Sequence, residues 1–288
     1  MGLCFGVRPF EFQDFIKVIK KGKDISSINY TEVVRNSLQN KFQHFEVTSD
    51  LAYVLPGLLS NDVINQLTEF KNRNEYTCSV HLPLWGIELA SPNEYIKNAS
   101  IECIVDAIQK TKILNPVCWV VHATGALISE FTRIQLPPFV KEFMTRRFAS
   151  IAQESLEQII DRTNISPRNL AVENVEFPFR EMDEFIEALD LSVCFDTGHL
   201  LAGYSGEWDG GVLDFFETYR DRIAEFHIHD GKKPRIDHKP LGEGDLPVRE
   251  ILDKLIKVDF TGPIVFEIDL DEVEKSMTFI KENIPAAL

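Results

Sequence analysis

Long hydrophobic runs are missing from this sequence, since no apolar stretch approaches the ~20 residues that a transmembrane helix requires. The apolar part of the opening segment, MGLCFGVRPFEF, is too short for a signal peptide. The five cysteines are odd in number, lie mostly within apolar runs and show no CxxC spacing, which indicates reduced, buried thiols. We therefore expect a soluble cytoplasmic protein with no membrane partner.

Positive charge is scarce, because 30 lysines and arginines face 45 aspartates and glutamates, for a formal net charge of −15. Such a balance disfavours non-specific attraction to a polyanion such as DNA, unless a local basic patch or bound metal ions offset the charge. We expect a small-molecule substrate rather than a nucleic acid. The sequence predicts no particular oligomeric state.

A glycine-rich GxGxxG turn does not follow the first apolar run, which argues against a doubly wound dinucleotide-binding sheet. No internal repeat or interdomain linker is visible, and 288 residues of which 44% are hydrophobic are enough to bury one large core. Short apolar runs alternate with helical segments, which predicts eight βα units. We predict a single (β/α)8 TIM-barrel domain over residues 1–288, with an open doubly wound sheet as the alternative.

The predicted strands are the short apolar runs, and the predicted helices carry apolar residues on one face. The strands cover residues 1–7, 44–47, 76–81, 117–122, 170–175, 191–196, 223–229 and 264–269. The helices cover residues 8–21, 31–42, 62–72, 94–112, 138–162, 180–189, 212–222, 247–256 and 271–282.

Residues of the types that bind metal ions stand at the ends of six consecutive predicted strands: His81, His122, Glu173, Asp196, His227 and Glu267. The carboxyl ends of barrel strands converge on one mouth, where such enzymes keep their active site. Taken alone, His122 has the ordinary explanation of a hydrogen-bonded core histidine, and Glu173 that of a loop cap. Six in succession predict a metal site, and imidazole mixed with carboxylate favours zinc or manganese over calcium or magnesium.

The segment IAEFHIHDGKKPRIDHKPLGEGD, residues 223–245, adds further candidates. Alternate residues of a strand share a side, so His227 and His229 are expected on one face. A long polar loop then brings Asp237 and His238 to the site, and the glycines of LGEGD allow a tight turn around it. The alternative is a surface loop with solvated histidines. His44 and Glu46 end a weakly defined strand and are left out of the predicted site.

Several motifs spread over residues 76–269 resemble those of the xylose isomerase-like TIM barrels, a group that includes sugar epimerases and endonuclease IV. The motifs are SVHLPLWGIELASPNE, VVHATG, LAVENVE, CFDTGHLLAGY, FHIHD, DHKPLGEGD and IVFEID. The resemblance implies a metal-dependent enzyme with one to three divalent ions, zinc or manganese. HLPL and ENVEFPF are most similar to a branch of phosphodiesterases that remodel cobamides.

The resemblance implies different ligand sets for the two kinds of enzyme. In the epimerases one ion would be held by Glu173, Asp196, His227 and Glu267, with His199 near the substrate. In endonuclease IV-like phosphoesterases His81, His122 and Glu173 would hold one ion, and Glu173 would bridge to a second held by Asp196, His227 and Glu267. His199, Asp237 and His238 would form a third site, although the family pattern places one residue between the last two and here they are adjacent.

We predict hydrolysis of a small phosphodiester, such as a cobamide nucleotide loop, because His81, His122 and His238 are surplus to a one-metal isomerase. The alternative is a sugar or sugar-phosphate isomerase or epimerase, in which Glu173 and Glu267 alternate as base and acid. An abasic-site DNA endonuclease and a non-catalytic binding module are further alternatives. Glu173 and Glu267 are the predicted catalytic residues. His199, His229 and Trp85 are predicted to contact substrate, although a loop-stabilising histidine and a tryptophan that covers the mouth explain the last two equally well.

Overall fold

Eight parallel strands close into a barrel in the computed structural model, which describes residues 2–10, 12–20, 28–39, 41–55, 57–206, 208 and 210–288. The strands are β1 (Cys4–Val7), β2 (His44–Thr48), β3 (Thr77–His81), β4 (Trp119–Val121), β5 (Leu170–Glu173), β6 (Ser192–Asp196), β7 (Ile223–Ile228) and β10 (Pro263–Phe266). β1 pairs with both β10 and β2 and so closes the ring. The predicted (β/α)8 barrel is confirmed, and the open doubly wound sheet is wrong.

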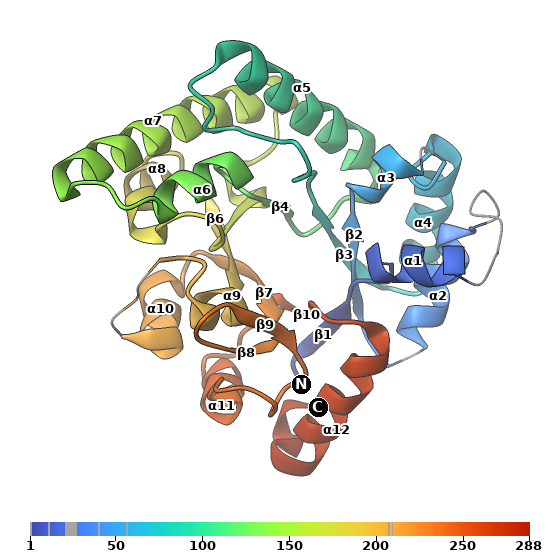
Figure 1. The fold of residues 1–288 in the computed structure, drawn as a ribbon. Coiled ribbons are helices and arrows are strands. Elements are labelled where there is room, and N and C mark those ends of the chain that lie inside the picture. The colour runs from blue at the N-terminus through green and yellow to red at the C-terminus, as the bar shows by residue number, and fades with distance from the viewer. Residues whose placement is uncertain are drawn as a thin grey trace.

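Helices surround the barrel on its outside (Figure 1). They are α1 (Phe12–Lys20), α2 (Tyr30–Leu38), α4 (Asn61–Arg73), α5 (Glu94–Thr111), α7 (Pro138–Thr163), α8 (Asp183–Ala188), α10 (Gly211–Tyr219), α11 (Val248–Lys257) and α12 (Leu270–Asn283). Each corresponds to one predicted helix, with α8 preceded by a 3-10 turn over Phe179–Met182. The predicted ends at Met1 and Lys21 lie outside the described residues.

Local sequence sets several helix ends. Ser60 caps α4 by accepting the backbone N–H of Val63, and Asn93 caps α5 by accepting that of Tyr95, so each side chain satisfies a donor that the helix itself leaves open. Asn164 ends α7 in the left-handed region, with φ 51°, which asparagine adopts more readily than most residues. Among the described residues, no helix combines the length and the apolar character that crossing a bilayer would take.

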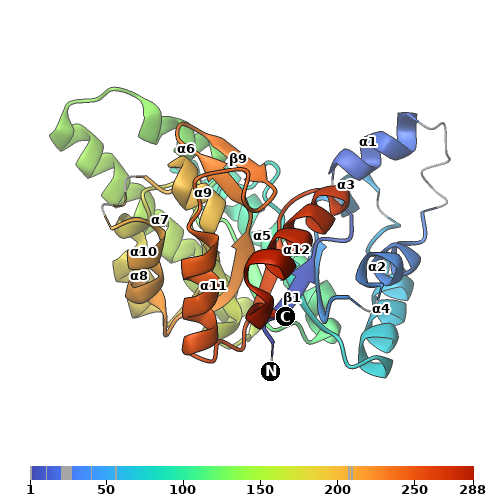
Figure 2. The ribbon, with the colours of Figure 1, turned by 90° about the horizontal axis from the view of Figure 1, so that it is seen from below.

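The loops at one end of the barrel contain more structure than the sequence predicted. Three short helices, α3 (Leu51–Val54), α6 (Ala126–Arg133) and α9 (Thr197–Ala202), and the antiparallel hairpin β8 (Asp230–Lys232) with β9 (Ile236–Lys239) lie there. The prediction of an irregular polar loop after β7 is therefore wrong for residues 230–239, which form this hairpin. Figure 2 shows α6, α9 and β9 at one end of the barrel and both termini at the other.

Side chains alternate along the strands between two different environments. Phe226 of β7 is fully buried outside the barrel wall, with ring centroids 5.1 Å from both Phe195 and Phe260 and 6.1 Å from Phe216. The neighbouring Glu225 points to the other side and accepts a hydrogen bond of 3.0 Å from Ser79 of β3. Because β3 and β7 are not neighbours in the ring, this contact crosses the barrel interior.

We predict that Phe226→Ala lowers the free energy of unfolding by about 3–5 kcal/mol, because it leaves a cavity among packed aromatic rings. The matched control is Phe139→Ala, since Phe139 is 74% exposed and its removal is expected to change stability by no more than about 0.5 kcal/mol. Denaturant unfolding of both variants measures the difference. Similar losses in the two would contradict this account of the core.

Candidate metal centre

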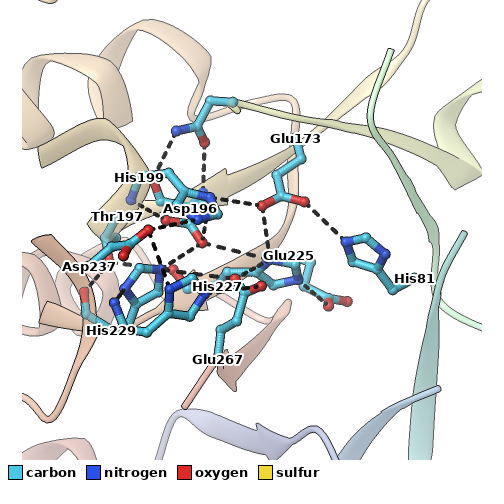
Figure 3. Close-up of polar contacts among 12 residues, drawn as sticks. His81, Glu173, Asp196, Thr197, His199, Glu225, His227, His229, Asp237 and Glu267 are labelled. Atoms are coloured by element: carbon cyan, nitrogen blue, oxygen red, sulfur yellow. Dashed lines mark hydrogen bonds and ion pairs between the residues drawn. The ribbon is translucent and has the colours of Figure 1, made fainter. Parts of the chain in front are cut away.

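The six candidate metal ligands predicted at strand ends gather at one mouth of the barrel. Figure 3 shows all of them except His122. His81, Glu173 and Asp196 end β3, β5 and β6, His227 lies near the end of β7, and His122 and Glu267 directly follow β4 and β10. All except His122 are at most 5% exposed. Buried imidazoles and carboxylates at this density require cations or protons between them.

The first group consists of His81, His122 and Glu173, whose ligand atoms lie within 4.8 Å of one another. Nε2 of His81 and Nε2 of His122 are 3.2 and 3.0 Å from the same oxygen, Oε2 of Glu173. Nδ1 of His81 donates to the carbonyl of Leu82 at 3.0 Å, because a carbonyl only accepts. Nε2 of His81 is therefore the nitrogen left to share a proton or a metal ion with Glu173.

The second group consists of Glu173, Asp196, His227 and Glu267. Nδ1 of His227 lies 3.5 Å from Oε1 of Glu173, 3.9 Å from Oδ2 of Asp196 and 3.1 Å from Oε2 of Glu267. Glu173 Oε1, His227 Nδ1 and Glu267 Oε2 are buried, yet they make no hydrogen bond within the described part of the chain. Converging, unsatisfied ligand atoms of this kind fit a divalent ion bound by one imidazole and three carboxylates.

Glu173 joins the two groups. Its Oε2 faces His81 and His122, whereas its Oε1 faces His227 and also Nδ1 of His199, at 3.3 Å. In Figure 3 the carboxylate lies between His81 on one side and the other site residues on the other. Glu173 would therefore be a ligand in both groups if each of them held a metal ion.

The residues expected at a third site, His199, Asp237 and His238, also come together, and His229 lies with them. Asp237 Oδ2 lies 3.5 Å from Nε2 of His199 and 3.3 Å from Nδ1 of His238. The histidines 199, 229 and 238 have ligand nitrogens within 4.8 Å of one another. The hairpin β8–β9 brings Asp237 and His238 to the mouth, although the two residues are adjacent in sequence.

His229 has both of its ring nitrogens engaged. Nδ1 accepts the backbone N–H of His238 at 2.8 Å, so in the neutral ring the proton is on Nε2, which donates to Oδ2 of Asp196 at 3.0 Å. The ring is fully buried and stacks on His238, and a Cβ at Gly198 would lie 2.1 Å from it. His229 thus links Asp196 to the β8–β9 hairpin, and its predicted contact with substrate stays a prediction.

Trp85 lies in the loop that follows β3 and is 43% exposed. Asp50 organises this loop by accepting the backbone N–H groups of Leu84 and Trp85. The predicted contact of Trp85 with substrate stays a prediction.

Sequence reasoning missed several charged residues that contact the site. Arg8 pairs with Glu46 and Glu267, Glu46 accepts from Nε2 of His227 at 3.1 Å, and Glu176 Oε2 lies 3.3 Å from Nδ1 of His122. Glu225, which directly faces the barrel interior, lies 3.5 Å from Nε2 of His227. The alternation in HFEVT and in AEFHI was the available signal, since it places Glu46 and Glu225 on the inner face.

The charges of the site shift the pKa values of its members. Burial alone would lower the pKa of His122, but Glu176 and Glu173 raise it well above its ordinary value. Burial alone would likewise lower the pKa of His227, but Cys194, Glu46 and Glu267 outweigh it and raise that pKa well above the usual range. The raised pKa values favour the protonated form of both rings at pH 7.

We predict that metal binding at pH 7 releases about one proton for each imidazolium displaced, and that the apparent affinity rises with pH. The sign follows from the raised pKa of His122 and His227, since both rings hold their protons at pH 7 and lose them only as pH rises. Zinc titrations by calorimetry in buffers of different ionisation enthalpy measure the protons. Binding enthalpies that do not depend on the buffer would contradict the prediction.

Comparison with known proteins places the fold among relatives of several functions. The family model described as xylose isomerase-like TIM barrel matches residues 35–283. An uncharacterized protein of Methanocaldococcus jannaschii is 24% identical over 270 residues, which cover 88% of this chain and 84% of that protein.

Two solved structures illustrate the range. A D-tagatose 3-epimerase-like protein superimposes with a TM-score of 0.67 at 23% identity, covering 90% of this chain and 96% of its own. Endonuclease IV of Thermus thermophilus gives a TM-score of 0.62 at 18% identity, covering 88% of this chain and 94% of its own. At these identities the two likenesses establish the fold alone.

Proposed function

The chain belongs to the xylose isomerase-like TIM-barrel family, and from the geometry of its mouth we propose that it is a divalent-metal-dependent phosphoester hydrolase. The observation that carries the proposal is the position of Glu173, whose two oxygens face two separate groups of ligand atoms. A one-metal isomerase has no use for His81 and His122 beside that carboxylate. A centre of two or more ions uses both histidines.

We assign the ligands by group. His81, His122 and Glu173 hold one ion, and Glu173, Asp196, His227 and Glu267 hold a second. His199, Asp237 and His238 are the ligands of a third. Two divalent ions, when bound, lower the pKa of water in the site and offset the negative charge that develops on a phosphoester in the transition state. The mixture of imidazole and carboxylate favours zinc or manganese.

Histidine nitrogens and one guanidinium surround the two predicted catalytic carboxylates, Glu173 and Glu267. Oε1 of Glu267 accepts from the Arg8 guanidinium, and its Oε2 faces Nδ1 of His227 at 3.1 Å. Both oxygens of Glu173 face histidine nitrogens. In each carboxylate the oxygen that makes no hydrogen bond within the described residues, Oε1 of Glu173 and Oε2 of Glu267, faces Nδ1 of His227, and we assign both carboxylates the role of holding metal ions.

The substrate that we propose is a small phosphodiester, for which a cobamide nucleotide loop is the candidate from the sequence. His199, His229 and Trp85 are the residues proposed to contact it. The net charge of −15 weighs against duplex DNA, despite the likeness of the fold to endonuclease IV. We further propose one domain across residues 1–288 and a cytoplasmic location.

A sugar or sugar-phosphate isomerase or epimerase is the second candidate. It is favoured by the group of Glu173, Asp196, His227 and Glu267, which is sufficient by itself for one divalent ion, and by the similarity of the fold to a D-tagatose 3-epimerase-like protein. This reading leaves His81 and His122 without a role in the reaction.

We predict that His81→Ala and His122→Ala each lose one metal equivalent and nearly all phosphodiesterase activity, because each removes a ligand of the first ion. Elemental analysis of the purified proteins and turnover of a phosphodiester panel measure the two effects. His44→Gln is the matched control, since His44 is a buried histidine that bonds Thr77 and Ser79 away from the mouth, and it is expected to keep the full metal content.

The isomerase reading makes the opposite prediction. It requires one metal equivalent in the wild type and in both variants, together with entry of solvent deuterium into a ketose carbon during turnover. That combination would replace the proposed hydrolase with an isomerase.

A further inference from the structure

A buried ion-pair unit lies directly behind the ligands that face the second ion. Arg8, which follows β1 and is 8% exposed, donates through Nε to Oε1 of Glu46 and through Nη1 to Oε1 of Glu267. Glu46 on β2 is fully buried. One guanidinium thus ties together carboxylates from β2 and from the end of β10, on either side of β1 in the barrel.

Glu46 of this unit contacts the nitrogen of His227 that faces away from the centre. Nε2 of His227 lies 3.1 Å from Oε2 of Glu46 and 3.5 Å from Oε1 of Glu225. Nε2 makes this hydrogen bond to a carboxylate, which only accepts, whereas Nδ1 makes none within the described residues, so the proton of the neutral ring is on Nε2 and the lone pair is on Nδ1. Nδ1 is the atom that faces Glu173, Asp196 and Glu267.

The same unit determines which oxygen of Glu267 faces the centre. Arg8 holds Oε1, which leaves Oε2 to point at Nδ1 of His227, at 3.1 Å. Oε2 is buried and makes no hydrogen bond within the described residues. Glu267 therefore faces the second ligand group through one oxygen only, Oε2.

We propose that Arg8 and Glu46 are positioning residues, which set the tautomer of His227 and the single metal-facing oxygen of Glu267. The inference rests on the proposed metal centre but not on the reaction performed there. Groups that hold metal ligands by hydrogen bonds from behind are worth about 10–100-fold in metal affinity.

A purely electrostatic role makes a different prediction from a positioning role. If only charge mattered, removing the Arg8 cation would tighten the binding of a divalent ion, and removing the Glu46 anion would weaken it. If positioning matters, both changes weaken binding, because each releases a ligand from its orientation. The sign of the Arg8 effect separates the two roles.

The experiment is a Zn²⁺ titration against a competing chelator dye for wild type, Arg8→Met, Glu46→Leu, Glu46→Gln and Lys97→Met. Arg8→Met and Glu46→Leu are expected to weaken zinc binding about 10–100-fold. Glu46→Gln keeps an oxygen acceptor for Nε2 of His227 and is expected to lose less than Glu46→Leu. Lys97 is the matched control, a buried cation that pairs with Glu94 and Glu154 outside the mouth, and Lys97→Met is expected to bind zinc as the wild type does.

Thermal unfolding with and without zinc shows whether each variant is folded. If Arg8→Met does not fold, Arg8→Lys takes its place, because a lysine is a point charge that cannot hold both carboxylates in the fork geometry, and it too is expected to weaken binding. Zinc bound by the Arg8 variant as tightly as by wild type, or more tightly, would overturn the inference. Equal losses in the two Glu46 variants would overturn the tautomer role.

The result is separable from the proposed reaction. A wild type that binds zinc but hydrolyses no phosphoester counts against the hydrolase and leaves the positioning role intact. If the wild type hydrolyses a phosphoester but the variants bind zinc as tightly as the wild type does, the positioning role is wrong and the hydrolase proposal stands.

Discussion

Negative charge held out of water at the mouth of a closed barrel is the constraint on which the rest of the site depends. Glu46, Glu173, Asp196 and Glu267 are each at most 5% exposed. Among the ion pairs of the described residues, Arg8 supplies the one guanidinium or ammonium group that reaches any of these four. The excess is more than one divalent ion offsets when all four are ionised, so the site needs further positive charge, from a second ion or from protonated histidines.

The barrel interior below these buried carboxylates is polar as well. TIM barrels commonly fill the interior with bulky branched side chains, but here His44, Ser79 and Glu225 form a hydrogen-bonded polar layer. Small side chains complete it, and a Cβ at Gly6 would lie 2.8 Å from the His44 ring. The barrel thus gives up apolar packing inside and keeps it between strands and helices, where Phe195 and Phe226 pack.

The fold and the mouth could be predicted from the sequence because both follow from simple periodicities. Apolar runs marked the strands, and parallel strands must bring residues such as His81 and Glu267 to one end. Glu46 was left out because its strand was weakly defined in the sequence, and Arg8 was not recognised because it was placed at the start of the first predicted helix. The hairpin β8–β9 was missed because its residues show no apolar alternation, and α9 because Asp196 ends a strand and caps a helix at once. The shared role of Glu173 was implied only by the family resemblance, because the direction of each of its oxygens depends on side-chain torsions that no spacing encodes.

The central claim is that Glu173 bridges two metal ions. The most direct measurement is anomalous X-ray scattering from crystals of the zinc-loaded wild type, recorded on both sides of the zinc absorption edge. The account predicts at least two zinc peaks, one beside His81 and His122 and one beside Asp196, His227 and Glu267, with the Glu173 carboxylate between them. A single zinc peak among Glu173, Asp196, His227 and Glu267, with His81 and His122 bound only to protein groups, would contradict it.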